Sequence, residues 1–280
     1  MPDIAASVLA KLKNKAKKED KSVQLCLQLF AQEEFVRRIE KSDYSDNFIL
    51  KGGLLIYSLS GYESRSTVDI DFLITHVSNN LDRAEEMLNE IINVQTENDY
   101  ISFEIVKKEQ IALHRKYPGV AFSIAGHIKN VRIPFGVDLG IGDVIVPNGQ
   151  KRKLQTQLMG FEPPEINTYS LESVVAEKFD AILSMMEFSS RMKDYFDIYY
   201  LSQNFEFDTD ILATALRETF RNRERNYSIN DFEHVMALAG NKEMIRKWNA
   251  FIKKLKLEYI EFNFVIEHID KFLRKVFKNS

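Results

Sequence analysis

Hydrophobic residues change their spacing along the chain, and the changes predict an α/β part followed by a helical part. Leu25 and Leu29 recur at helical spacing within residues 11–38, which predicts one long helix. Across residues 100–146 apolar and polar positions alternate, which predicts strands. Helical spacing then returns and continues through residues 170–280. The pattern therefore favours an α/β (α+β) fold with a mixed sheet first and a bundle of helices second.

Turn residues and run lengths divide these parts into individual elements. Residues 47–74 predict a strand, a glycine turn, a helix and a second strand, and a further turn is expected at Pro118-Gly119. More strands are expected near 101–105, 120–128 and 131–141, with helices at 81–94, 170–188, 191–203, 208–222, 229–239, 241–256 and 258–278. We expect an α/β domain with an N-terminal helix over residues 1–160 and a helical domain over residues 161–280, joined near 150–168.

Two carboxylates lie two positions apart in the apolar run from Val68 to Ile74, and this pattern indicates a metal site. On a strand, Asp69 and Asp71 project from the same face. Two unpaired carboxylates in that position are costly because of desolvation and mutual repulsion. A divalent cation removes the cost, and oxygen ligands suit Mg²⁺, which shares its shell with substrate phosphates. We therefore expect Mg²⁺, with Mn²⁺ as the alternative, at this strand.

Asp138 is a third candidate metal ligand, because it is the other acidic residue embedded in an apolar strand of this region. If its strand lies beside residues 68–74, three carboxylates converge, as two-metal phosphoryl and nucleotidyl transfer requires. The alternative is a turn residue at the end of a strand.

Adjacent glycines, Gly52 and Gly53, separate an apolar run from a helix-like run. A glycine turn at the start of a helix presents backbone N–H groups to phosphates, so we expect both glycines to bind a triphosphate. The further candidates for phosphate contacts are Lys51, Arg65, Ser66 and Thr67. Each of these has a plain alternative as part of a strand end or a polar loop. The carboxylates and the turn together favour nucleotidyl transfer.

Lys178 lies on an otherwise apolar stripe of the helix expected at 170–188. A buried lysine is costly unless it meets an anion, which a triphosphate would supply; the alternative is an amine that reaches solvent. Arg191, Asp194 and Asp197 follow on one side of the next helix. There an aspartate pairs with Lys178 or acts as a base on the acceptor hydroxyl, or the three residues form a local row of ion pairs.

The formal charge of −3 hides two basic ends and an acidic middle. Residues 1–22 carry six Lys against three acids, and residues 241–280 carry ten Lys or Arg against five. Basic ends fit contacts with a nucleic acid backbone, and solvated helix faces are the alternative. The basic residues on adjoining turns near the C-terminal end are Lys242, Arg246, Lys247, Lys253 and Lys254.

Cysteine, histidine and hydropathy exclude several classes. A single cysteine, Cys26, excludes a disulfide framework. The histidines, which lack metal-ligand spacing, are His76, His114, His127, His234 and His268. Without a signal peptide or an apolar run of membrane length, we expect a cytoplasmic protein with no membrane partner.

Two blocks of the sequence together resemble a known family. The first is Lys51-Gly52-Gly53 followed by Arg65-Ser66-Thr67-Val68-Asp69-Ile70-Asp71-Phe72, and the second is Glu177-Lys178 followed by Arg191-Met192-Lys193-Asp194-Tyr195-Phe196-Asp197. The first block resembles the DNA-polymerase-β-like nucleotidyltransferases. The two blocks together resemble, more narrowly, the AbiEii/MenT group of bacterial toxins, over roughly residues 45–205.

The resemblance implies a polymerase-β-like nucleotidyltransferase domain and an Mg²⁺-dependent enzyme that is the toxin of a toxin–antitoxin or abortive-infection (phage defence) system. Lys178 is similar to the catalytic lysine of the group, and one catalytic aspartate, Asp194 or Asp197, is implied. With the metal ligands, the catalytic set is Asp69, Asp71, Asp138, Lys178 and Asp194 or Asp197, and Arg191 joins the nucleotide-binding set.

The resemblance also implies partners. Some members of the group add nucleotides to the 3′ end of tRNA, which implies an NTP substrate, an RNA acceptor such as tRNA and a separate antitoxin that binds DNA as a regulator. Two alternatives stay open. One is the same transfer to a small molecule such as an antibiotic, and the other is a non-catalytic nucleotide-binding partner module.

Overall fold

The computed structural model describes residues 3–61, 64–76, 81–111 and 119–278, so His114 and Pro118 lie outside the described residues. The chain divides into two compact units. Unit 1 comprises Met1–Gly142 and Gln150–Thr168, and unit 2 comprises Asp143–Gly149 and Tyr169–Ser280. Among the helices that the structure describes, none has both the length and the apolar character that crossing a membrane requires.

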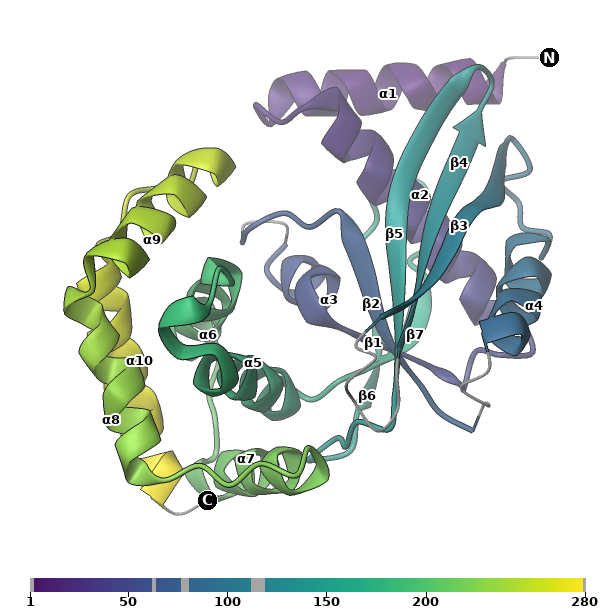
Figure 1. Cartoon of the computed structure of the whole chain (residues 1–280). Helices are drawn as coiled ribbons and strands as arrows, with labels where there is room; N and C mark the ends of the chain where they lie inside the picture. Colours follow the sequence, from purple (N-terminus) through teal and green to yellow (C-terminus); the bar gives the residue numbers. More distant parts are fainter. Residues whose placement is uncertain (1–2, 62–63, 77–80, 112–118, 279–280) are drawn as a thin grey trace. The chain divides into compact units, whose positions relative to one another are not determined.

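Unit 1 is built around one mixed sheet (Figure 1). Within the described residues the strands are β1 (Phe48–Lys51), β2 (Asp69–Ile74), β3 (Ile101–Ile111), β4 (Gly119–Ile128), β5 (Val131–Ile141), β6 (Gln150–Lys153) and β7 (Glu165–Thr168). They lie in the order β3-β4-β5-β2-β1-β7-β6. β2 is parallel to β5 and β1 is parallel to β7, whereas the other neighbours are antiparallel. The strand with the two aspartates, β2, is therefore central.

Residues 150–168, expected to join two domains, form the strands β6 and β7 instead of a linker. β6 reads Gln-Lys-Arg-Lys, and nothing in that run alternates between apolar and polar. The pair is held in the sheet because β7 lies parallel to β1, with Ile49 beside Asn167. The predicted boundary between residues 160 and 161 falls between these two strands, and the division into domains stays a prediction.

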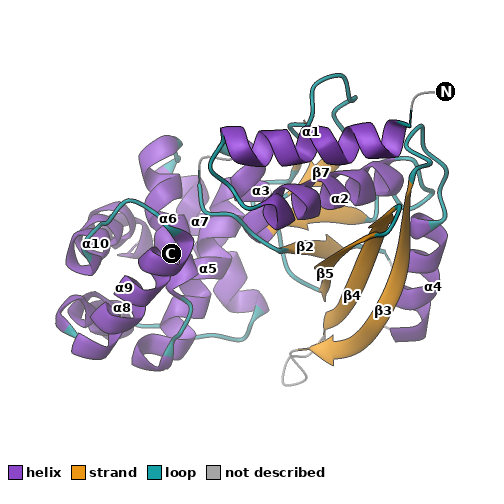
Figure 2. Cartoon of the chain, turned by 90° about the horizontal axis from the view of Figure 1, so that it is seen from above, coloured by secondary structure: helices purple, strands orange, loops and turns teal. Residues whose placement is uncertain are grey.

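Two helices, α1 (Ile4–Lys18) and α2 (Val23–Glu40), replace the single helix expected at 11–38. The chain turns at Asp20, whose φ is +50°, and Ser22 then caps α2 by accepting a hydrogen bond from the Leu25 N–H at 3.1 Å. The single-helix prediction is therefore wrong. The break between the two helices was missed because no glycine or proline marks it in the sequence. α1 lies on the outer side of α2, and α2 lies against the sheet (Figure 2). The other described helices of unit 1 are α3 (Gly52–Leu59) and α4 (Leu81–Ile92).

α2 is buried along most of its length although it is rich in polar residues. Buried polar groups need hydrogen-bond partners, and two glutamines of α2 find theirs on the sheet. Gln32 donates to the Val68 carbonyl at 2.6 Å, and Gln28 donates to the Pro134 carbonyl at 2.8 Å. α2 thus anchors the residue that precedes Asp69 and the strand that carries Asp138.

Unit 2 is helical, apart from the segment 143–149. Its described helices are α5 (Leu171–Met185), η1 (Met186–Phe188), α6 (Met192–Asn204), α7 (Thr209–Asn222), α8 (Ile229–Ala237), η2 (Leu238–Gly240), α9 (Lys242–Leu255) and α10 (Phe262–Lys278). α10 packs against α6, α7 and α8 (Figure 1). The core there includes Trp248 and Tyr195, both fully buried. The predicted fold class, a mixed sheet followed by a helical bundle, is confirmed.

Candidate active site

Asp71 and Asp138 lie side by side on neighbouring parallel strands. β2 and β5 are in register here, with Asp71 opposite Asp138 and Ile70 opposite Val137. Side chains of paired residues project to the same face of a sheet, so the two carboxylates share one face while Ile70 and Val137 are buried on the other. The neighbouring position of the two strands, on which the expected acidic cluster depended, is confirmed. Both aspartates are half-buried.

Asp69 lies on the same face, at the exposed first position of β2. It pairs with Gly136, where a Cβ would overlap Asp69 Oδ1, so the glycine makes room for this carboxylate. Within the described ranges, no group of three or more Asp, Glu, His or Cys side chains is gathered so as to hold a metal ion. Mg²⁺ commonly takes one or two carboxylates and fills its shell with water and substrate phosphates. The donors therefore fit Mg²⁺ through the neighbouring pair Asp71 and Asp138 rather than through a closed cage.

Gly52 and Gly53 turn the chain from β1 into α3 directly beside Asp71. Gly52 has a φ of +66°, and a Cβ there would overlap the Asp71 carboxylate. A Cβ at Gly53 would lie 3.0 Å from Thr67 Oγ1. Lys51, the residue before α3, forms no side-chain cap, and the first-turn N–H groups of a helix have no partner within the helix. The start of α3 therefore lies beside Asp71 with donors that a phosphate can use.

Lys51 continues the row of charged residues across the sheet. It pairs in register with Asp71 across antiparallel strands, which places its side chain on the face of the aspartates. Its amine lies against Gly140 of β5, 3.3 Å from where a Cβ would stand. Lys51 therefore lies over the acidic face, and the phosphate contact expected of it stays a prediction.

The loop before β2 is held by contacts of its own side chains with Gly53 and with the backbone of β2. Arg65 is buried, and its guanidinium lies against Gly53. Thr67 donates its hydroxyl to the Asp69 carbonyl at 3.2 Å, and Ser66 is half-buried between them. The structure thus brings together the first block, and the phosphate contacts assigned to Arg65, Ser66 and Thr67 stay predictions.

Lys178 is buried in unit 2 between two aspartates of α6. Its Nζ lies 3.1 Å from Asp194 Oδ1 and 2.6 Å from Asp197 Oδ2. The lysine side chain is 10% exposed and the aspartates are 0% and 1% exposed. The anion that a buried lysine needs is therefore supplied by these two carboxylates, and the amine does not reach out to solvent as the alternative required.

Arg191 is the second cation at Asp194. Its Nε lies 2.5 Å from Asp194 Oδ2, and half of its side chain is exposed. Burial raises the pKa of Asp194, but the charges of Lys178 and Arg191 outweigh burial, and the pKa lies below its ordinary value of 3.8. Both Asp194 and Asp197 contact Lys178, so each stays a candidate for the single catalytic aspartate.

A buried cluster around Arg223 was not predicted. The Arg223 guanidinium lies 2.8 Å from Asp180, 3.0 Å from Asp143 and 3.3 Å from Glu177. Glu177 and Asp180 are three positions apart on α5, a weak signal for one shared face, but nothing in the sequence connects them to Asp143. The neighbours Glu177 and Lys178 thus face two different ion clusters.

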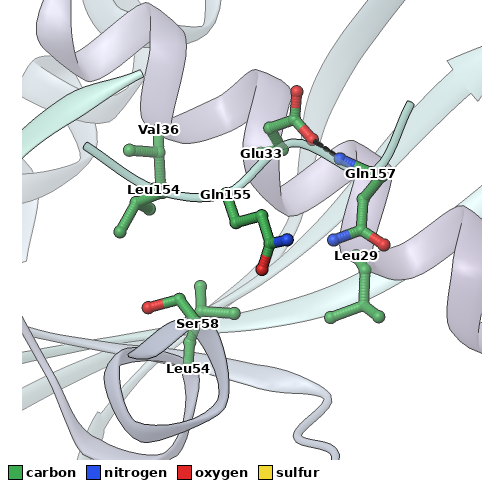
Figure 3. Close-up of a pocket in the computed structure, with 8 residues that line it drawn as sticks. All are labelled: Leu29, Glu33, Val36, Leu54, Ser58, Leu154, Gln155 and Gln157. Carbon is green, nitrogen blue, oxygen red and sulfur yellow. Dashed lines mark hydrogen bonds between the residues drawn. The ribbon is translucent and has the colours of Figure 1, made fainter. Parts of the chain in front are cut away.

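A small pocket in unit 1 lies outside the predicted site. The residues around it are Leu29, Glu33, Val36, Leu54, Ser58, Leu154, Gln155 and Gln157 (Figure 3). Glu33 accepts a hydrogen bond from the Gln157 backbone N–H at 2.6 Å and pairs with Arg37 at 2.8 Å. Burial dominates these contacts and raises the pKa of Glu33 to about 7. No pattern in the sequence indicates that an acid of α2 is buried.

Comparisons with known proteins agree with this fold and with the two sequence blocks. The family described as nucleotidyl transferase AbiEii toxin, of type IV toxin–antitoxin systems, matches residues 34–274. Among solved structures, MenT4, a nucleotidyltransferase toxin from Mycobacterium tuberculosis H37Rv, is similar with a TM-score of 0.60 and 14% identity over 97% of each chain. A putative nucleotidyltransferase from H. pylori is similar with a TM-score of 0.44 and 15% identity over 99% of each chain. No curated protein matches the sequence.

The mixed sheet and the match with MenT4 define the fold as that of the nucleotidyltransferase toxins. The family match extends over most of both units. The chain belongs to the nucleotidyltransferase AbiEii toxin family, and its family implies a nucleotide substrate and a cognate antitoxin.

Proposed function

We propose that the chain transfers a nucleoside monophosphate from an NTP to an RNA acceptor, the 3′ end of tRNA, in a reaction that depends on Mg²⁺. The acceptor hydroxyl oxygen attacks the α-phosphorus. The bond from that phosphorus to the bridging oxygen breaks, and pyrophosphate leaves with the electron pair. The hydroxyl proton passes to a base, for which Asp194 and Asp197 are the candidates.

The observation that carries this proposal is the in-register pair Asp71 and Asp138 beside the Gly52 turn. With Asp69, these residues would hold Mg²⁺ together with phosphate oxygens of the substrate. When bound, the cation would neutralise charge on the triphosphate and favour ionisation of the attacking hydroxyl.

The remaining groups suit the binding of a triphosphate. The start of α3 lies next to Asp71, and the Lys51 side chain lies on the acidic face, where substrate phosphates would meet a cation. In unit 2 the half-exposed Arg191 is more accessible to a phosphate than Lys178, whose amine is buried between carboxylates. We therefore assign Lys178 the role of holding Asp194 and Asp197 in place.

The basic C-terminal segment supports a nucleic acid acceptor. α9 exposes Lys242, Arg246, Lys253 and Lys254. Lys247, which the sequence grouped with them, instead donates to the carbonyls of Glu187 at 3.2 Å and Ser189 at 3.0 Å. Exposed cations of this kind bind phosphates with release of counterions.

Incubation with each α-labelled NTP, Mg²⁺ and total RNA tests the transfer. The wild type should label an RNA of tRNA size, and chelation of Mg²⁺ should abolish the label. Asp71→Asn should lower transfer by at least about a hundredfold, since a metal ligand is lost. Asp46→Asn, at an exposed aspartate before β1 that is not part of the candidate site, is the matched control and should keep full activity. Full transfer by Asp71→Asn, or label only on small molecules, would contradict the proposal.

Toxicity and the antitoxin give a second test. Expression of the wild type should arrest growth, and expression of Asp69→Ala should not, because both transfer and arrest depend on the same face. We propose that the antitoxin is a separate DNA-binding regulator whose co-expression restores growth. Equal arrest by the wild type and Asp69→Ala would trace the harm to overexpression rather than to chemistry.

A further inference from the structure

A second pocket, in unit 2, is lined by none of the residues of the candidate site. Its lining comes from α7, the loop after it, the start of α8 and the end of α10, which lies beside α7 (Figure 1). The lining residues are Arg217, Phe220, Arg221, Arg225, Asn226, Tyr227, Ile229, Phe277 and Lys278. The volume of about 560 Å³ is in the range of ligand sites.

The rim of this pocket is cationic. Arg217 and Arg221 are one turn apart on α7 and so share a face, while Arg225 follows in the loop and Lys278 comes from α10. All four are exposed, and the nine described lining residues include no carboxylate. The neighbouring Glu218 pairs with Arg221. Glu233 lies near enough to Lys278 for that cation to contribute to lowering the pKa of its carboxyl, so two acids offset part of the four positive charges. The rim therefore keeps a surplus of positive charge that an anion would neutralise.

The floor of the pocket is aromatic and rigid. The rings of Phe220 and Tyr227 are 5.0 Å apart between centroids, and those of Phe220 and Phe277 are 6.2 Å apart. Tyr227 is fixed because its hydroxyl donates to Asp180 Oδ1 at 3.0 Å. Asp180 is held in turn by Arg223. Phe220 and Phe277 are buried beneath the rim, whereas Tyr227 is half-buried. Tyr227 is therefore the one of these three rings against which a base can stack, in a fixed orientation and beside cations.

We propose that this pocket binds the sugar–phosphate backbone of a single-stranded part of the RNA acceptor, with a base against the aromatic floor. The inference rests on the proposed function, because it takes the acceptor to be RNA. Arginines that meet phosphates, next to aromatic rings that stack with bases, are the combination used by proteins that bind single strands. A free nucleotide carries the same chemical groups, so the test compares the two sources.

The test measures binding of a labelled 12-nucleotide single-stranded RNA by fluorescence anisotropy over a range of salt concentrations. The variant carries Arg217→Gln, Arg221→Gln and Arg225→Gln. Loss of three phosphate contacts should flatten the log–log salt slope by about 2 and weaken binding roughly a hundredfold at 0.1 M salt. Adding ATP or inorganic phosphate at equal ionic strength should displace little RNA, since neither spans the rim.

The matched control removes three positive charges elsewhere, with Lys107→Gln, Lys151→Gln and Lys153→Gln, and should keep the wild-type slope within about 0.5. Thermal melts of both variants should match the wild type, because the substituted residues are exposed. An unchanged slope and affinity in the arginine variant would overturn the inference. So would tight binding of ATP that is lost in the arginine variant while RNA binding persists.

Failure of the two proposals would look different. If the wild type labels RNA and the arginine variant binds RNA as the wild type does, the pocket inference alone is overturned. If the wild type neither labels RNA nor shows salt-dependent RNA binding, the RNA acceptor of the proposed function is overturned, and the pocket inference with it.

Discussion

Gly52 joins backbone conformation to the position of a carboxylate. Its φ of +66° is costly for any residue with a Cβ, by about 1–2 kcal/mol, and a Cβ would also overlap Asp71. Gly52→Ala should therefore lower the free energy of unfolding by roughly 2–4 kcal/mol and impair transfer, because Asp71 must move. Chemical denaturation and the labelled-NTP assay measure the two effects.

The chain supplies a control for this substitution. Gly240 has nothing within 4 Å of the place where a Cβ would stand, so Gly240→Ala should change stability by less than about 0.5 kcal/mol. Equal effects of the two substitutions would show that the contact with Asp71 does not matter.

Glu33 gives the protein a dependence of stability on pH. Its pKa is raised from 4.5 to about 7, so the folded protein holds a proton that the unfolded chain has released in this interval. Stability should thus be highest below pH 4.5 as far as this group is concerned, and should fall by about 3 kcal/mol as pH rises through 7. Glu33→Gln should remove this fall, since the amide keeps the shape and never ionises.

Urea denaturation at pH 5 and pH 8 measures the difference. The control is Glu206→Gln, which removes an exposed carboxylate of the other unit and should leave the pH dependence unchanged. A fall of the same size in Glu33→Gln would mean that another group titrates. Glu33 lies outside the two sequence blocks that resemble known toxins, so the resemblance does not predict its raised pKa.

At the scale of elements, Arg223 ties α5 to the end of α7 and to the segment 143–149. Its side chain is 11% exposed and faces three carboxylates. Arg223→Met should cost about 3–5 kcal/mol, because uncompensated buried charges remain. Arg221→Met, at a side chain 77% exposed, should cost less than about 1 kcal/mol. Similar thermal melting of both variants would contradict the role of the cluster.

The elements also show how far the sequence predicts this fold. Long periodic runs predict the helices of unit 2, and the i, i+2 spacing of Asp69 and Asp71 places both on one face. Periodicity does not reveal β6 and β7, since β7 owes its place to pairing with β1 and β6 owes its place to pairing with β7. Nor does it reveal α2, where buried polar residues find partners far along the chain.

The candidate site shows the same division. The sequence predicts that buried Lys178 requires an anion, but only the packing of α5 against α6 shows that two aspartates provide it. That Asp138 belongs beside Asp71 depends on which strand neighbours β2, and no local pattern determines this. Chemistry that arises from adjacent residues was predictable, whereas chemistry that arises from pairing of distant segments was not.

At the scale of the whole molecule, unit 1 is complete only with residue 168. A truncated chain of residues 1–168 retains β7 beside β1 and should melt cooperatively as a monomer. A chain of residues 1–160, ending at the predicted boundary, loses β7, which is the strand that pairs with β6 among the described residues, and exposes the edge of β1. It should aggregate or melt without a transition. Size-exclusion chromatography and circular dichroism compare the two, and equal behaviour would make β7 dispensable.

The late position of β7 also sets an order of events during synthesis. β1 leaves the ribosome early, whereas its parallel neighbour is translated only after the rest of the sheet's central strands and the segment 143–149. Until then the nascent chain holds β1 with one edge unpaired, the state in which strands associate with other chains. The strand that leads into Lys51 and the two glycines is β1, and it gains its second hydrogen-bonded neighbour only when β7 has been translated. Translation of this toxin therefore includes an interval in which the sheet that carries its aspartates still lacks the strand β7.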